Sequence, residues 1–157
     1  MVQKILTLLK NDGCWFETFE HEPVRTSEEA AKVRPEYSLC QGAKALIVRA
    51  KIRQNKRNFV MLVFPADLKF DRDKVEALLE AKDVRLASES EADSITDGVQ
   101  LGGVPPFGNL FGLEVLVDSS LFRNEKIIFN AGDRRFSIGM KSDDYRRLVK
   151  PKVCEIV

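Results

Sequence analysis

Apolar residues recur along the chain at spacings that alternate between helical and strand-like. The first twelve residues place apolar side chains on one helical face, and Gly13 stands where a helix C-cap belongs. A strand is predicted over 15–19. A short helix is predicted over 27–33, because Thr26 and Glu29 form a capping box at its start. The chain therefore opens with a helix, a strand and a second helix.

Two pairs of strand-like segments predict antiparallel hairpins. Segments 45–51 and 59–64 are rich in Ile, Val, Leu and Phe, and a polar stretch joins them. Segments 126–129 and 136–140 have the same character and are predicted to pair across a turn at 131–133. Neighbouring strands that are joined by short polar turns pair antiparallel, so both predicted hairpins contribute to an antiparallel or mixed sheet.

Several short elements complete the prediction. They are a helix capped by Asp71, a strand over 84–87, a helix that Ser88 caps and that ends near Gly98, a strand over 113–117, and a last helix over 143–149 that Ser142 caps. Strands outnumber helices and hairpins recur, which indicates an α+β fold with a mixed or largely antiparallel sheet and several short helices packed around it. No linker or repeat divides the chain, so residues 1–157 are predicted to form a single domain.

Composition and charge narrow the class of protein. The chain has a net charge of +1, but its charges are unevenly distributed. Basic residues gather between 49 and 57 without an acid among them, so the predicted hairpin tip carries Arg53, Lys56 and Arg57. These three side chains are candidate contacts for a phosphate backbone. Charge alone also allows an ordinary solvated surface.

Several classes of chemistry lack their usual signals. The sequence has no HExxH, GxSxG or Walker A motif, and His21 is its only histidine. The three cysteines, Cys14, Cys40 and Cys154, are far apart, so neither a zinc site nor a redox pair is indicated. We therefore expect no metal and no other cofactor. No signal peptide or membrane-length apolar run is visible, and we expect a cytoplasmic protein.

The segment 102–108, Gly-Gly-Val-Pro-Pro-Phe-Gly, is the strongest local signal. Glycines let backbone N–H groups approach a ligand closely, and prolines stiffen the loop that carries them. Such a loop suits the binding of a carbonyl or carboxylate group. A stiff connection between two elements would have the same composition, and the sequence does not separate these two interpretations.

Lys44 is the second candidate, since it stands at the start of an apolar strand. Beside the glycine loop, its ammonium group could polarise an ester carbonyl or hold a phosphate. A lysine at a strand end is also common as a solvated flank. Only its position relative to the glycine loop can separate these interpretations.

Taken together and in this order, five segments of the chain resemble the YbaK/prolyl-tRNA synthetase-associated domain family. They are the Phe19-Glu20-His21-Glu22-Pro23 turn with the Thr26 helix after it, the Lys44 strand, the Gly102 to Gly108 loop, the 130–138 hairpin, and the helix that follows Ser142. The sequence departs from the family pattern at Pro105, where a small polar residue is frequent, and at Asp133, where a basic residue is frequent. Both departures could change which substrate is accepted.

The resemblance implies a free-standing trans-editing hydrolase that removes a small amino acid from the 3′ end of mischarged tRNA. By analogy, Lys44 is the catalytic residue and the Gly102 to Gly108 loop holds the aminoacyl group. The substrate-binding residues implied are Gly102, Gly103, Pro106, Phe107, Gly108, His21, Thr26 and Asn130. The partner is aminoacyl-tRNA, and an aminoacyl-tRNA synthetase is a possible second partner.

An already activated ester needs little more than oxyanion stabilisation and a positioned water, so the lack of an evident general base agrees with this chemistry. Two other functions are consistent with the same residues. One is a non-catalytic module that binds tRNA or a nucleotide, and the other is an interaction domain that has lost both activities. Measured turnover distinguishes the hydrolase from the non-catalytic binding module. Substitution of Lys44 or Gly102 distinguishes it from the interaction domain, because such a domain would tolerate either change without loss of function.

Overall fold

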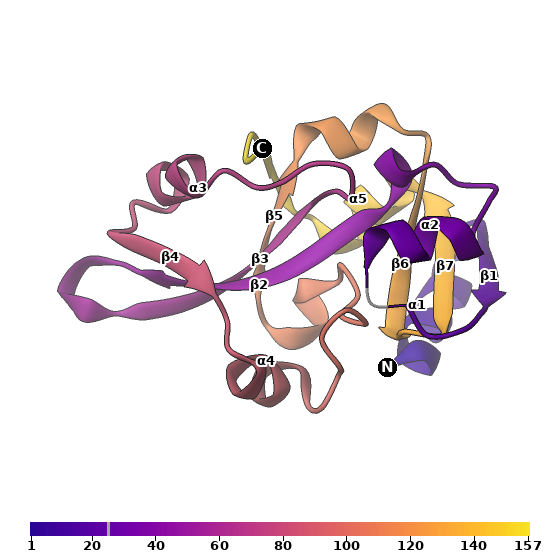
Figure 1. The fold of residues 1–157 in the computed structure, drawn as a ribbon, viewed down its shortest axis with the longest axis horizontal. Coiled ribbons are helices and arrows are strands. Elements are labelled where there is room, and N and C mark those ends of the chain that lie inside the picture. The colour runs from indigo at the N-terminus through magenta and orange to yellow at the C-terminus, as the bar shows by residue number, and fades with distance from the viewer. Residues whose placement is uncertain (25) are drawn as a thin grey trace.

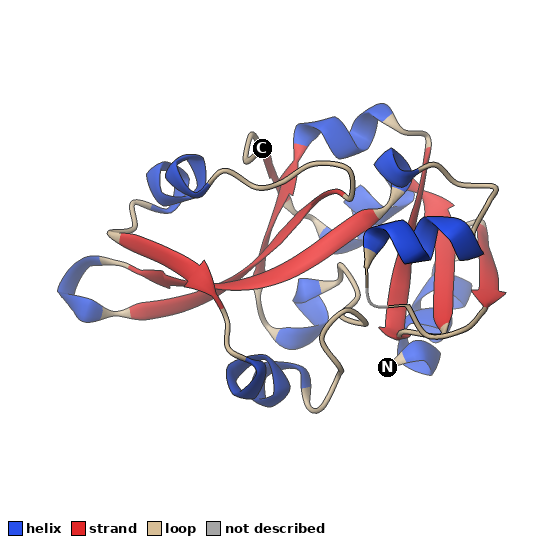
Figure 2. Cartoon of the chain, in the orientation of Figure 1, coloured by secondary structure: helices blue, strands red, loops and turns tan. Residues whose placement is uncertain are grey.

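The computed structural model describes residues 1–24 and 26–157 and contains two β-sheets with short helices around them (Figures 1 and 2). The helices are α1 Val2–Asp12, α2 Ser27–Val33, α3 Arg72–Leu79, α4 Glu89–Thr96 and α5 Ser142–Val149. The strands are β1 Phe16–Glu20, β2 Ala43–Lys51, β3 Arg57–Pro65, β4 Asp83–Leu86, β5 Glu114–Asp118, β6 Lys126–Asp133, β7 Phe136–Lys141 and β8 Lys152–Cys154. Single 3-10 turns join several of them.

The larger sheet has the strand order β4-β2-β3-β5-β8 and is mixed. Strands β4, β2 and β3 are antiparallel, whereas β3 pairs with β5, and β5 with β8, in parallel. The smaller sheet, β1-β7-β6, is antiparallel throughout. The predicted α+β class with a mixed sheet is confirmed, and so are both predicted hairpins.

Strand β3 explains why the larger sheet has apolar groups on both faces. Met61 and Val63 face the core that the two sheets share with α1 and α5, and Val60, Leu62 and Phe64 face a second cluster under α3. Alternate residues of a strand point to opposite faces, so a strand that is covered on both sides needs an unbroken apolar run. The run seen in the sequence at 59–64 is therefore a central strand.

Figure 1 shows how the elements frame the space between the sheets. The hairpin of β2 and β3 projects away from the rest of the molecule, with β4 along one edge. Helix α2 lies in front of β6 and β7. The opposite end of β2 therefore reaches the region where α2 and the smaller sheet meet.

Local signals placed most element boundaries correctly. The Thr26 hydroxyl accepts the N–H of Glu29 at the start of α2, and Ser88 and Glu91 form the predicted capping box of α4. Gly13 ends α1 in the left-handed conformation, with φ 74°. Side-chain hydrogen bonds within three residues are local, and this explains why the sequence predicts them.

Two local predictions need correction, and one strand was missed. Ser142 does not cap α5, because it is the first helical residue and its hydroxyl donates to the carbonyl of Asn124 at 2.6 Å. The turn of the second hairpin lies after Asp133, since a bulge between Asn130 and Asp133 lets β6 pair with β7 up to Phe136. Strand β8 was not predicted, because three residues near a chain end carry little periodic signal.

No helix among the described residues is long and apolar enough to cross a membrane.

Candidate active site

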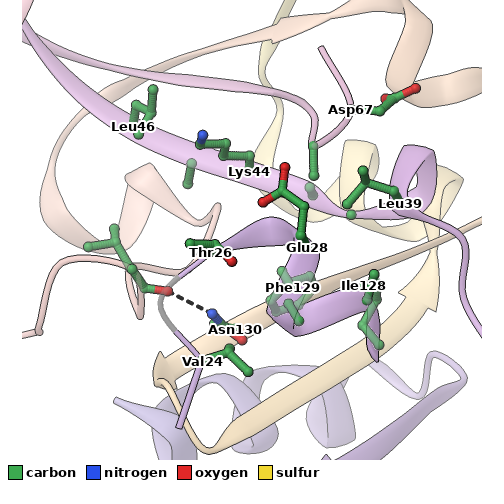
Figure 3. A pocket seen from close by; sticks show the side chains of 18 of the residues that line it. Val24, Thr26, Glu28, Leu39, Lys44, Leu46, Asp67, Ile128, Phe129 and Asn130 are labelled. Carbon is green, nitrogen blue, oxygen red and sulfur yellow. Dashed lines mark hydrogen bonds between the residues drawn. The ribbon is translucent and has the colours of Figure 1, made fainter. Parts of the chain in front are cut away.

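A cavity of about 600 Å³ lies between α2, β2, the glycine loop and β6. Pockets of 300–1,000 Å³ are the usual size for small ligands. Its lining includes Thr26 and Glu28 at the start of α2, Lys44 on β2, Gly102 in the loop and Asn130 on β6 (Figure 3). Four candidates that are distant in the sequence, Thr26, Lys44, Gly102 and Asn130, therefore meet at one cavity.

Lys44 is the second residue of β2 and pairs in register with Phe64 of β3. Its side chain is exposed and lines the cavity. Within the described part of the chain, no carboxylate lies within 4.0 Å of its ammonium nitrogen. A lysine without a protein counter-charge at the wall of a cavity is available to a ligand oxygen.

The glycine loop is held against the smaller sheet by its backbone. The Asn130 amide donates to the Gly102 carbonyl at 2.6 Å, as the dashed line in Figure 3 marks, and Gly132 N–H donates to the Gly103 carbonyl at 2.8 Å. Gly102 has φ 87°, a conformation that side chains disfavour. Its own N–H donates to no acceptor in the described residues, so this group is free for a ligand.

The second half of the loop lies in the core and does not line the cavity. Phe107 is fully buried, with ring centroids 5.4 Å from Phe129 and 5.5 Å from Tyr145. The Tyr145 hydroxyl donates to the Pro106 carbonyl at 2.6 Å. A Cβ at Gly108 would lie 2.6 Å from a Val115 methyl group. These three loop residues anchor the loop, whereas Gly102 reaches the cavity.

His21 does not line the cavity, but a chain of hydrogen bonds connects it to the lining. Its Nε2 lies 2.7 Å from the Ser137 hydroxyl, which lies 3.2 Å from the Asn130 side-chain oxygen. Its Nδ1 lies 2.8 Å from the carbonyl of Glu22, which can only accept, so Nδ1 carries a hydrogen. His21 is therefore linked to the cavity lining through Ser137 and Asn130, and Asn130 in turn bonds to the Gly102 carbonyl.

Arg34 is the most deeply buried of the charged lining residues that sequence reasoning missed. It follows α2, lines the cavity and is only 7% exposed. Its Nε donates to the Ala30 carbonyl and its Nη1 to the Ser137 hydroxyl, both at 3.2 Å. Burial lowers the pKa of Arg34 to about 10, which leaves the guanidinium charged near neutral pH. Arginine at a helix end resembles an ordinary solvated charge, so the sequence carried no signal for it.

Two acids, Glu28 and Asp67, also line the cavity and were not predicted. An aminoacyl ester carries a cationic α-ammonium group close to its carbonyl, and a carboxylate on the wall complements that charge. The cavity thus combines cations and a free backbone N–H, which suit an oxyanion, with acids that suit an ammonium group.

The three basic candidates for tRNA binding lie elsewhere. Arg53, Lys56 and Arg57 are exposed at the tip of the β2–β3 hairpin, which projects from the molecule in Figure 1. None of them lines the cavity. In the described residues, no cluster of three or more His, Cys, Asp or Glu side chains is arranged to hold a metal ion.

Comparison with known proteins identifies the family of this chain. Residues 21–148 match the aminoacyl-tRNA editing domain family. The chain is 33% identical over 153 residues to the multifunctional Ser/Thr-tRNA deacylase ProXp-y of Escherichia coli strain K12, and the alignment covers 96% of this chain and 89% of that protein. The same protein from Escherichia coli O157:H7 matches with the same values.

Solved structures share the fold. The hypothetical protein APE2540 superposes with a TM-score of 0.84 at 24% identity, covering 98% of each chain. A candidate trans-editing enzyme for prolyl-tRNA synthetase superposes with a TM-score of 0.82 at 20% identity, covering 99% of this chain and 95% of that one. The match over most of the chain shows that this protein belongs to the aminoacyl-tRNA editing domain family and is a hydrolase that deacylates mischarged tRNA.

Proposed function

We propose that this deacylase removes serine and threonine from mischarged tRNA, and that Lys44 and Gly102 form its catalytic centre. The observation that carries the proposal is that Lys44 and Gly102 line one cavity, and that the Gly102 N–H has no acceptor among the described residues. The similarity to a Ser/Thr-tRNA deacylase supports the choice of amino acids. Both are small, polar acyl groups that a cavity of about 600 Å³ accommodates together with part of the terminal nucleotide.

The chemistry is the addition of water to an ester. Water oxygen bonds to the acyl carbon, the bond from that carbon to the ribose oxygen breaks, and the proton released by water ends on the ribose oxygen. Negative charge develops on the carbonyl oxygen, where Lys44 and the Gly102 N–H donate to it. A single oxyanion donor of this kind contributes about 3–4 kcal/mol to catalysis.

The other lining groups orient the substrate. Glu28 lines the cavity from the start of α2 and pairs with the α-ammonium group of the aminoacyl ester. Asn130 is a positioning residue, since its amide is already used to hold Gly102. Thr26 caps α2 and keeps Glu28 on the first turn of that helix. Hydroxyl groups of the terminal ribose position the attacking water.

The substrate also suggests where the protein acts. Aminoacyl-tRNA is made and used by the translation machinery, so we propose a cytoplasmic location. Arg53, Lys56 and Arg57 contact tRNA phosphates in this proposal, because they are exposed on a projecting hairpin and have no acid among their sequence neighbours. An aminoacyl-tRNA synthetase as a second partner stays a prediction from the family resemblance.

The test is release of labelled amino acid from a panel of seryl-, threonyl-, alanyl-, cysteinyl- and prolyl-tRNA. We expect hydrolysis of the first two in preference to the others. Lys44→Ala should lower kcat/KM by about 10²–10³, as loss of one oxyanion donor does in other hydrolases. The matched control is Lys4→Ala, because Lys4 is an exposed lysine of α1 that does not line the cavity.

Three results would contradict the proposal. Hydrolysis of other aminoacyl-tRNAs but not of the seryl and threonyl species would refute the substrate assignment. Activity of Lys44→Ala equal to that of Lys4→Ala would refute the catalytic role of Lys44. Binding of tRNA without hydrolysis of any species would favour the non-catalytic module.

A further inference from the structure

Arg34 is a buried cation with no counter-charge beside it among the described residues. No carboxylate among the described residues lies within 4.0 Å of its guanidinium group. Its two hydrogen bonds, to the Ala30 carbonyl and the Ser137 hydroxyl, use two of the five N–H groups that a guanidinium carries. Arg34 lines the cavity, and the described residues offer its remaining N–H groups no acceptor.

The position of Arg34 within the cavity indicates which part of the substrate it meets. Three of the four large apolar side chains that are exposed in the described residues belong to the cavity lining, namely Leu86 at 52%, Leu101 at 44% and Leu68 at 38%. The nucleotide must extend from the cavity to the body of the tRNA, so it passes these exposed side chains. The acyl group then occupies the inner part, where Arg34 is 7% exposed.

Neighbouring contacts hold the guanidinium in place. Arg34 and Asn130 both bond to the Ser137 hydroxyl, each at 3.2 Å, and Asn130 in turn bonds to the Gly102 carbonyl. Arg34 therefore lies one shared hydroxyl away from the residue that positions the oxyanion loop. A donor fixed in this way can select for a ligand oxygen at one position, because its own rotamer is already determined.

We propose that Arg34 is the specificity residue that donates a hydrogen bond to the side-chain hydroxyl of the acyl group, and so selects serine and threonine over acyl groups of similar size without that oxygen. This inference rests on the proposed seryl- and threonyl-tRNA deacylase function. An alanyl or 2-aminobutyryl group would leave the buried guanidinium with an unmet N–H. Sites built to bond a hydroxyl reject analogues that lack it for this reason.

The test measures binding and turnover on pairs of acyl groups that differ by one oxygen. The probes are non-hydrolysable 3′-amino-3′-deoxyadenosine amides of serine and alanine, and of threonine and 2-aminobutyrate, titrated by calorimetry. The wild-type protein should bind the hydroxylated member of each pair about 10- to 100-fold more tightly. Arg34→Met should reduce this ratio to about one, with the affinity for the alanyl amide nearly unchanged.

Two further variants guard against a simple folding defect. Arg34→Lys keeps the charge but lacks the planar fork of donors, so it should fold and lose part of the preference. Lys32→Met removes a positive charge from an exposed position of α2, the helix that Arg34 follows, and should leave the ratio unchanged. Thermal melting of each variant reports whether it is folded.

The outcomes separate this inference from the proposed function. If Arg34→Met keeps the serine-to-alanine ratio, or loses affinity for both amides equally, Arg34 does not read the hydroxyl, and seryl-tRNA hydrolysis by the wild type still supports the deacylase. If the wild type hydrolyses neither seryl- nor threonyl-tRNA, the proposed function fails. In that case, hydroxyl recognition by Arg34 would still be supported if the wild type prefers the seryl amide and Arg34→Met abolishes that preference. If the wild type shows no such preference, both the proposed function and the role of Arg34 are overturned.

Discussion

The hydrogen bond from Tyr145 to Pro106 ties the glycine loop to the core, and its removal is the sharpest test of how the loop is held. Tyr145 is fully buried on α5, and its hydroxyl donates to the Pro106 carbonyl at 2.6 Å. Tyr145→Phe deletes that hydroxyl and keeps the ring contacts with Phe107 and Phe122. The Pro106 carbonyl is then left buried without its donor.

The size of the effect follows from that unmet carbonyl. Leaving one buried hydrogen-bonding group without a partner costs about 1–3 kcal/mol. In a domain of 150–250 residues, each kcal/mol lowers Tm by about 2–4 °C, so the expected loss is about 2–12 °C. The larger values apply if the surrounding core keeps water away from the carbonyl, and the smaller ones if the loop relaxes toward solvent.

The assay is thermal unfolding followed by circular dichroism, together with urea unfolding at 25 °C. We expect a lower midpoint with an unchanged m value, because the surface exposed on unfolding does not change. Tyr145→Leu, which also removes the ring, should lower Tm further. A Tm for Tyr145→Phe within about 1 °C of the wild type would refute the reasoning, since it would mean that the buried carbonyl costs nothing when its donor is removed.

Three further predictions concern packing, pH and tRNA. Gly108→Ala should cost about 1–3 kcal/mol in a urea unfolding measurement, because its Cβ would lie 2.6 Å from a methyl group of the core, and a stability equal to the wild type would contradict this. Burial raises the pKa of Asp118, but hydrogen bonds from the Ser120 hydroxyl and from backbone N–H groups outweigh it and leave the pKa below 3.8. The ionised Asp118 therefore stabilises the fold at pH values above the ordinary pKa of an aspartate, and this stabilisation is lost as pH falls through the lowered pKa. Asp118→Asn should flatten the fall in stability between about pH 5 and pH 2. An unchanged slope would show that Asp118 does not contribute to this fall. Replacing Arg53, Lys56 and Arg57 by alanine should reduce the salt dependence of tRNA binding by about one unit of log–log slope for each lost phosphate contact, and an unchanged slope would place tRNA elsewhere.

Most of the secondary structure could be predicted because its signals are local. The capping residues Thr26 and Ser88, the C-cap Gly13 and the apolar run of β3 each act within a few residues of the chain. Errors occurred where a partner distant in the sequence decided the outcome. Ser142 bonds to the carbonyl of Asn124 in place of its own helix, and β8 exists because β5 offers it a parallel edge.

The candidate site was predictable only in part. Lys44 and Gly102 could be proposed from residue type, and both line the cavity. The same loop also contains Phe107 and Gly108, which the family resemblance assigned to substrate binding but which pack into the core. Arg34 carried no signal at all, because a guanidinium at a helix end is buried or solvated according to what packs over it.

The sequence by itself determined the α+β class, the two hairpins, the helix boundaries set by capping residues, and the family resemblance, because each depends on short-range periodicity or on residues in a recognisable order. The tertiary structure alone decided which halves of the glycine loop face the cavity and the core, that His21 bonds to Ser137, and that Arg34 is a buried donor with no carboxylate near it among the described residues. These features depend on contacts between residues up to 116 positions apart. Such contacts form only when both sheets pack together, and no local pattern along the chain encodes them.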